Sequence, residues 1–280
     1  MQFGVVLPLP DTCTSSPGNH PGGIPAPVLD WNPITSAGAA SAFAAVLAGF
    51  VFAGIVVTLG QPHPDAARQV HADRALKLLL AAFFTLAVDA YLYAISGGEQ
   101  VCLRGDTEQA MNGGGLALGA ILILLALGWL VVAYKRDASI AFARHMTEFA
   151  MYFIILMLVT ASTGYLNAAL PKTEHPMGNG LMWGFGALSA GLVACMFRMG
   201  HLRALDSTHV VALDKRVHQA AWAGLAFAGS SATVSGIAMS IGASHWYPEA
   251  PWLLVYLIAW FALVAPVMVE FVAIRAVVRQ

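Results

Sequence analysis

Asp89 is the side chain with the clearest chemical potential, because it is a carboxylic acid inside an otherwise apolar stretch from Ala75 to Ile95. An ionisable group at the centre of a membrane-spanning helix costs at least about 2.5 to 3.5 kcal/mol, so it faces protein or a water-filled cavity. A carboxylate offers hard oxygen ligands and can be neutralised by a proton. Asp89 therefore predicts a site for a proton or small cation. The alternative is a hydrogen bond that only joins helices, measured at about 0.6 kcal/mol.

Hydroxyl groups at a similar depth in other apolar stretches extend this candidate site. Asp89 lies about 14 residues from the basic end of its stretch, or roughly 21 Å at 1.5 Å per residue. Threonines of the fourth stretch and serines of the sixth lie level with it, and Glu270, after the helix-kinking Pro266, lies toward the basic end of the last stretch. The predicted transport or ion-binding residues are Asp89, Thr160, Thr163, Ser231, Ser235 and Glu270.

Other kinds of chemistry fit the sequence poorly. None of the nine histidines lies centrally in an apolar stretch, whereas haem ligation and zinc hydrolysis within a membrane need imidazoles on facing helices. Residues 252–274 contain no lysine, which excludes the covalent retinal attachment of microbial rhodopsins. No nucleophile and base can be placed at one depth, so we do not expect an enzyme. We predict no metal and no cofactor; a lipid, quinone or pigment bound without a covalent link would leave little trace in the sequence.

The composition indicates that membrane helices position these residues. Of 280 residues, 58% are hydrophobic and 10% are charged, against roughly 25% charged in soluble proteins. About 20 apolar residues are enough to cross the hydrocarbon core. We predict an all-α polytopic membrane protein, a seven-transmembrane-helix bundle with a domain at 34–280. Its spans run approximately over residues 34–59, 75–95, 111–134, 145–170, 180–197, 220–241 and 252–274, and the fifth is the shortest.

Basic residues set the predicted orientation. If the N-terminus is outside, the inner connections carry twelve Lys and Arg residues, and the outer ones carry only Arg104 and Lys172. Because short connections rich in basic residues stay in the cytoplasm, we predict an outer N-terminus and a cytoplasmic C-terminus. Ten Arg against four Lys, with abundant Ala and Gly, suggest a bacterial protein, and hence a plasma-membrane location.

The N-terminal segment, residues 1–33, holds seven prolines and no basic residue. This composition predicts an extended extracytoplasmic tail rather than a signal peptide or a folded domain. Cys13 in this tail and Cys102 after the second span both fall outside, whereas Cys195 lies within the fifth span. We predict a Cys13–Cys102 disulfide, which would close a loop of about 90 residues and stabilise the protein by roughly 4 to 5 kcal/mol. The alternative is two free thiols.

These features together predict a channel- or transporter-like protein that handles a proton, cation or small solute through a polar layer around Asp89. The alternative is a non-catalytic membrane subunit, or a receptor or sensor of a larger complex. It is suggested by the absence of a catalytic motif and by small residues that recur four apart in the sixth span. Expected partners are the lipid bilayer, with further copies of the chain or other membrane proteins. The net charge of −1 gives no reason to expect nucleic acid.

Overall fold

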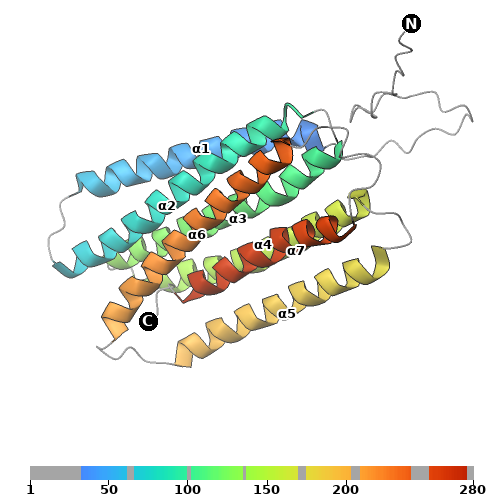
Figure 1. Ribbon diagram of the computed structural model, residues 1–280. Helices are drawn as coiled ribbons and strands as arrows, with labels where there is room; N and C mark the ends of the chain where they lie inside the picture. Colours follow the sequence, from blue (N-terminus) through green and yellow to red (C-terminus); the bar gives the residue numbers. More distant parts are fainter. Residues whose placement is uncertain are drawn as a thin grey trace, which may run out of the picture.

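The computed structural model describes residues 33–61, 66–99, 102–134, 137–169, 175–202, 209–240 and 252–275, and these form seven α-helices. The helices are α1 (Pro33–Gly60), α2 (Ala66–Ser96), α3 (Cys102–Ala133), α4 (Asp137–Ala169), α5 (His175–Leu202), α6 (His209–Ser240) and α7 (Trp252–Ile274). Consecutive helices run in opposite directions (Figure 1). The predicted all-helical fold is therefore confirmed over these residues. The proline-rich tail lies outside them except for Pro33, which begins α1.

Most of the helices extend beyond the apolar spans that the sequence predicts. The third span was predicted to begin at Met111, but α3 begins at Cys102, and its first turns include Arg104 and Glu108. The difference has a simple cause: helix hydrogen bonds are internal, so polar residues continue a helix beyond its apolar part. Apolar length locates the segment that can lie in hydrocarbon, and not the ends of the helix.

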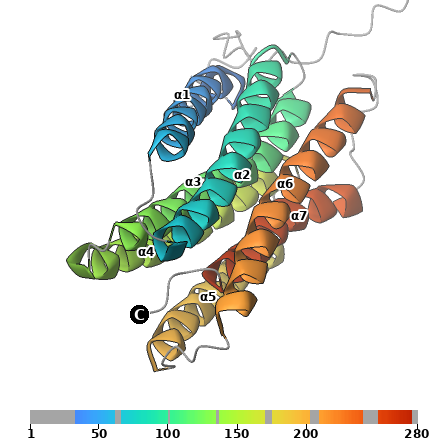
Figure 2. The ribbon, with the colours of Figure 1, turned by 90° about the vertical axis from the view of Figure 1, so that its left-hand side faces the viewer.

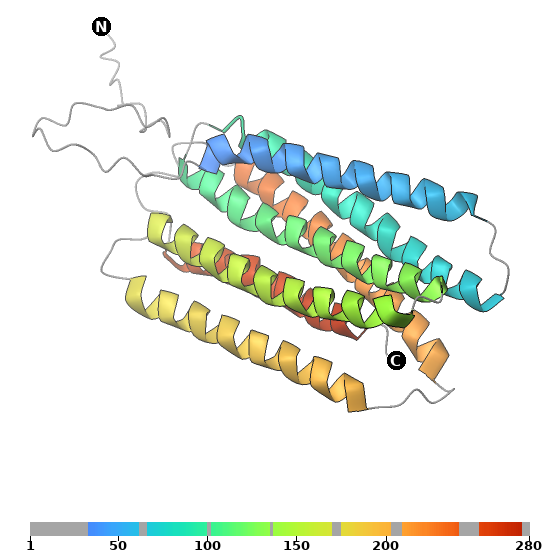
Figure 3. The ribbon, with the colours of Figure 1, turned by 180° about the vertical axis from the view of Figure 1, so that it is seen from behind.

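The seven helices form two layers. One layer contains α1, α3, α4 and α5, and the other contains α2, α6 and α7 (Figures 1 and 3). The outermost helices are α1, which packs against α2 and α3, and α5, which packs against α4 and α7 (Figure 2). Helix α3 touches α1, α2, α4, α6 and α7. Because α3 has neighbours in both layers, its residues control how closely the layers approach.

Below, the end of the bundle where α2 ends and α3 begins is called the Ser96 end. The opposite end, where α2 begins, is called the Ala66 end. Helices α1, α3, α5 and α7 run from the Ser96 end to the Ala66 end, and α2, α4 and α6 run back (Figure 1). These two names define depth in the bundle without reference to the sides of a membrane.

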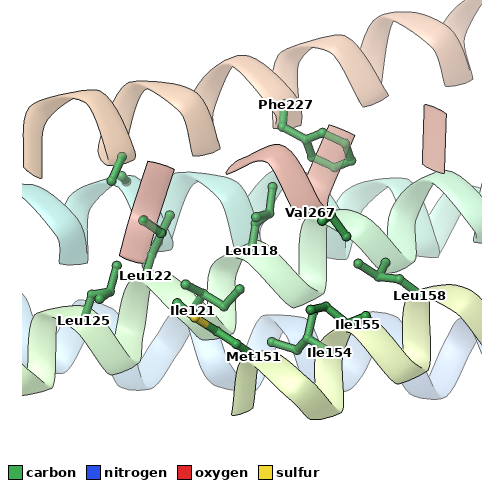
Figure 4. Close-up of a cluster of buried hydrophobic side chains, with 14 of the residues drawn as sticks. Leu118, Ile121, Leu122, Leu125, Met151, Ile154, Ile155, Leu158, Phe227 and Val267 are labelled. Atoms are coloured by element: carbon green, nitrogen blue, oxygen red, sulfur yellow. The ribbon is translucent and has the colours of Figure 1, made fainter. Parts of the chain in front are cut away.

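The apolar core lies between α3, α4 and the other layer. Leucine and isoleucine side chains of α3 face those of α4, and Phe227 of α6 and Val267 of α7 pack near them (Figure 4). The residues of α3 and α4 at this contact include Leu118, Ile121, Leu122, Leu125, Met151, Ile154, Ile155 and Leu158. Large apolar side chains also cover the outside of the bundle, for example Phe50, Phe142 and Leu188. Extensive exposed apolar surface is typical of a protein that contacts membrane or other proteins.

Six of the seven helices are long and apolar enough to cross a membrane: α1, α2, α3, α4, α5 and α7. The short fifth span meets this criterion, whereas α6 does not. Helix α6 has 32 residues, enough in length, but glycine, serine, threonine and charged residues dilute its apolar content. Length, composition and exposed apolar side chains together define a multi-pass membrane protein.

Candidate functional site

Asp89 lies inside the bundle, on the face of α2 that packs against α3. It is only 2% exposed, and its Oδ2 atom has no hydrogen-bond partner among the described residues. Thr85 and Tyr93, one turn to either side, are also buried, so three polar side chains follow one another along this face. The aspartate thus faces protein rather than the surroundings of the bundle, as the cost of a carboxylate in hydrocarbon requires.

Glycine residues of α3 make room for this face of α2. A Cβ atom added to Gly115 would lie 2.6 Å from Oδ1 of Asp89, and one added to Gly119 would lie 2.5 Å from Leu86. Both distances are far below the roughly 3.5 Å of a favourable contact between heavy atoms. Because glycine has no Cβ, α2 and α3 approach closely along this line, and the carboxyl group packs directly on the α3 backbone.

Gly114, the neighbouring residue of α3, makes room for the rest of the second layer. A Cβ at Gly114 would lie 2.6 Å from Cζ of Phe227 in α6 and 2.8 Å from Cγ of Pro266 in α7. Helices α2, α6 and α7 therefore all meet α3 at the level of Gly114 and Gly115. Asp89 lies at this meeting point.

Three other predicted site residues are also buried with unpartnered polar atoms. Glu270 is 0% exposed, and neither carboxyl oxygen has a partner among the described residues. It follows Pro266 by one helical turn, which puts it about 6 Å nearer the Ala66 end. Ser231 and Ser235 of α6 are each 2% exposed, with hydroxyl groups that lack a partner in the same part of the chain. Counted from Phe227, they lie about 6 and 12 Å toward the Ser96 end, so these groups occupy successive depths.

The two predicted threonines of α4 are placed differently. Thr160 is exposed, and its hydroxyl donates a hydrogen bond of 2.9 Å to the carbonyl of Met157. Thr163 is buried, and its hydroxyl lies 2.8 Å from the Val159 carbonyl and 3.0 Å from the Thr160 carbonyl. Both hydroxyl protons are therefore engaged within α4 itself. Within the described residues, neither threonine has a hydrogen bond to Asp89.

A further buried polar group lies nearer the Ser96 end, and sequence reasoning does not identify it. Glu108 and Asn112 of α3 and Ser96 of α2 are each at most 1% exposed. Nδ2 of Asn112 donates to Oγ of Ser96 at 3.3 Å, and that hydroxyl donates to the Leu92 carbonyl at 3.0 Å. In the described part of the chain, the two carboxyl oxygens of Glu108 and Oδ1 of Asn112 have no hydrogen-bond partner.

An ion pair lies beside this group at the Ser96 end. Arg104 donates through Nε and Nη2 to the two carboxyl oxygens of Glu99, the second at 2.7 Å. The side chains of Arg104 and Glu99 are only 16% and 7% exposed. Arg104 precedes Glu108 by one turn on α3, so its guanidinium group lies between Glu108 and the end of the bundle. A bidentate pair of this kind has a fixed geometry as well as a favourable energy.

The position of α3 explains why Glu108 was missed. A span that begins at Met111 assigns Glu108 to an outer connection, where an acid needs no explanation. The helix in fact continues to Cys102. The available signal was spacing: the residues at 104, 108, 112, 115 and 119 recur every three or four positions, which places them on one helical face.

Charged residues at the Ala66 end form a separate cluster. Arg74 is 2% exposed; its Cζ lies 4.9 Å from the ring centroid of Trp129, and its Nε lies 3.8 Å from Oδ1 of Asp214. Nζ of Lys77 lies 3.1 Å from the same oxygen, and the ring of His71 stacks on Trp129 at 5.5 Å. The cluster joins α2, α3 and α6. Its charges have partners, so it is explained by packing alone.

The small residues of α6 divide into two rows. Ser231 and Ser235 belong to the buried row, whereas Gly229, Thr233 and Gly236 are exposed. A Cβ at Gly229 or Gly236 would meet no atom of the described residues within 4 Å. One row therefore packs inside the bundle, and the other lies on its outer surface.

The predicted disulfide falls on residues that the structure does not describe. Cys13 lies outside the described residues, and so does the side chain of Cys102, although its backbone begins α3. Cys195 of α5 is an exposed free cysteine. The Cys13–Cys102 bridge therefore stays a prediction.

The fold and the buried acids define a class: a multi-pass helical membrane protein with ionisable groups between its layers. Comparison with known proteins adds nothing to this class, because no family model, no curated protein and no solved structure matches the chain.

Proposed function

We propose that this protein is a seven-span transporter or channel of the bacterial plasma membrane, with its N-terminus outside and its C-terminus in the cytoplasm. It moves protons, or a small cation, through the polar groups around Asp89. In this orientation the Ser96 end is the outer end. Helix α6 is the sixth of the seven spans, and α2, α3 and α7 shield one of its faces from lipid.

The observation that supports this proposal best is the burial of Asp89 against Gly115, with no hydrogen-bond partner for Oδ2 among the described residues. A carboxyl group that only joined helices would be expected to have its hydrogen bonds satisfied, since an unsatisfied buried polar group costs about 1 to 3 kcal/mol. In the same described part of the chain, polar atoms of Glu270, Ser231 and Ser235 also lack hydrogen-bond partners. A row of such groups at successive depths suits a proton or small cation that binds to each group in turn and is then released to the next.

The test is proton flux in liposomes that contain the purified protein. An imposed membrane potential drives flux, and a pH-sensitive dye inside the liposomes reports it. The substitution Asp89→Asn keeps the shape of the side chain but removes its ability to accept a proton. A positioned acid or base typically contributes at least about 100-fold to proton transfer, so flux should fall by about 100-fold.

Asp73→Asn is the matched control, because Asp73 is an exposed aspartate on the same helix. Its flux should equal that of the unchanged protein. If Asp89→Asn conducts as the control does at every pH, Asp89 does not carry the transported ion. If sodium or potassium flux falls while proton flux does not, the transported species is the metal cation.

A second function, a membrane subunit of a larger complex, is favoured by the outer surface of α6. Gly229, Thr233 and Gly236 are exposed there, four and three residues apart. Small residues at this spacing let another helix approach closely. Recovery of the purified protein as a single species with full flux would exclude an obligate subunit.

A further inference from the structure

We propose that Glu108, Asn112 and Ser96 form a second proton-binding site, located between the Glu99–Arg104 ion pair and Asp89. The inference rests on the proposed function for its role in transport, but proton binding can be measured without any flux. Glu108 is the ionisable group, Asn112 positions its proton, and Ser96 fixes the orientation of Asn112.

The contacts of Ser96 fix which end of the Asn112 amide is free. The Ser96 hydroxyl lies near Glu108 as well as near Leu92 and Asn112. It has only one proton, which it donates to the Leu92 carbonyl at 3.0 Å, so it can only accept from Asn112. The NH2 group of Asn112 therefore points at Ser96, and Oδ1 is the free atom. With its donor engaged and its acceptor open, Asn112 needs a donor from another group.

The remaining atoms of the cluster contain too many acceptors. Three oxygen atoms have no hydrogen-bond partner among the described residues: the two carboxyl oxygens of Glu108 and Oδ1 of Asn112. All three are acceptors when Glu108 is ionised. Protonation of Glu108 supplies the missing donor. The proton binds one carboxyl oxygen, and the resulting O–H group can donate a hydrogen bond to Oδ1 of Asn112. Glu108 and Asn112 are four residues apart on one helix, the spacing at which side chains meet. Release breaks the same O–H bond and restores the carboxylate.

The charged neighbours of Glu108 do not supply this proton or replace it. The nearest cation, Arg104, donates through two groups to Glu99. Asp106 is two residues from Glu108 on α3, so it lies on a different face of the helix. The hydroxyl of Tyr165 in α4 accepts a hydrogen bond of 3.1 Å from Thr107. On the α2 side, the ionisable groups among the described residues are Asp89, Tyr93 and, just beyond the helix, Glu99, which is paired with Arg104. A proton is therefore the species that suits these unpartnered acceptor oxygens.

The site also lies in the correct place to exchange protons with Asp89. Glu108 precedes Gly115, the residue that packs on Asp89, by two turns of α3, which corresponds to about 10 Å along the axis. Ser231 and Ser235 lie at intermediate and similar depths with open hydroxyl groups. Glu108, Asp89 and Glu270 thus follow one another from the Ser96 end toward the Ala66 end.

The experiment is infrared difference spectroscopy on the purified full-length protein in lipid, at neutral pH and after exchange into D2O. A protonated carboxyl group gives a carbonyl stretch that shifts on deuteration. E108Q should remove one such component and should leave the fold intact, because the glutamine NH2 group can donate to Asn112 as the acid does. N112A should keep the component but move it to higher frequency, since the hydrogen bond is lost. D106N is the matched control and should change neither feature.

Three results would overturn the inference. The first is an unchanged carboxyl band in E108Q. The second is an E108Q protein that does not fold, because glutamine provides the same donor as a protonated acid. The third is a band that is lost when sodium chloride replaces choline chloride at constant pH, which would identify a metal cation as the ligand. A Glu108 band that behaves as expected while Asp89→Asn has normal flux would retain the proton site and reject the proposed function.

Discussion

The contact between Asp89 and Gly115 predicts that a single added methyl group will both destabilise the protein and disturb the site. In Gly115→Ala, the new Cβ would lie 2.6 Å from Oδ1 and 3.1 Å from Cγ of Asp89. Overpacking of this kind costs about 1 to 3 kcal/mol. Alanine regains about 0.5 to 1 kcal/mol in helix propensity, so the net loss should be near 1 kcal/mol. Asp89 must rotate away, and flux should fall with stability.

Two comparisons isolate the cause of this loss. A Cβ at Gly128, on the same helix, meets nothing within 4 Å, so Gly128→Ala should stabilise the protein by about 0.5 to 1 kcal/mol. In an Asp89→Ala background, the nearest side-chain atom of residue 89 to the new methyl is Cβ at 3.5 Å, an ordinary contact. Gly115→Ala should therefore become neutral or stabilising there. The coupling between positions 89 and 115 should be about 1 to 3 kcal/mol, the strength expected of residues in direct contact.

The assay is reversible unfolding of the four proteins of this cycle, with Gly128→Ala as a fifth, in mixed micelles of increasing denaturing detergent. Secondary structure reports unfolding, and the free energies give the coupling directly. Equal effects of Gly115→Ala in both backgrounds would show that the carboxyl group does not pack on α3. Equal stabilisation by Gly115→Ala and Gly128→Ala would refute the close approach of the two helices.

Two further predictions concern the ends of the bundle. In intact cells that express a Cys195→Ser variant, a membrane-impermeant maleimide should label nothing until a reductant is added, and should then label both Cys13 and Cys102. Labelling without reductant contradicts the disulfide, and absence of labelling after reduction contradicts the orientation. At the other end, Asp214→Asn removes the partly exposed ion pair with Lys77, together with the longer contact to Arg74. It should cost about 1 kcal/mol or less at low salt, measured by the same unfolding assay. The loss should shrink in high salt, because exposed charges are screened, and a loss that salt does not change argues against the ion pair.

The fold was predictable to the extent that hydrophobicity determines it. Each of the seven apolar stretches corresponds to a helix, because a segment of that length in hydrocarbon must satisfy its own backbone hydrogen bonds. The ends of α3 and α4 were not predictable in this way, because internal hydrogen bonds let polar turns continue a helix beyond its apolar part. The partners of each helix were also open. Nothing in the order of the chain shows that α6 packs between α2 and α7 rather than at an edge.

The candidate site was predictable only in part, because the depth of a residue along its helix does not show which face of the helix it occupies. The burial of Asp89 follows from the cost of a charge in lipid, and this argument holds for Glu270 as well. Thr160 lies at a comparable depth but on the exposed face of α4, because a threonine can satisfy its hydroxyl on its own helix and pay no penalty in lipid. Glu108 was not predicted because the predicted third span begins at Met111 and leaves Glu108 in a connection, where an acidic residue carries no energetic cost.

The weak apolarity of α6 has a consequence for how the protein is made. A segment with so many small polar residues has little tendency to partition from the insertion channel into lipid by itself. Its buried face, with Phe227, Ser231 and Ser235, matches surfaces on α2 and α3 that the ribosome has already produced by then. The strongly apolar α7 follows and closes over it. Helices that are synthesised early therefore provide the binding surface that brings α6 into the membrane, so its insertion depends on the helices that precede it.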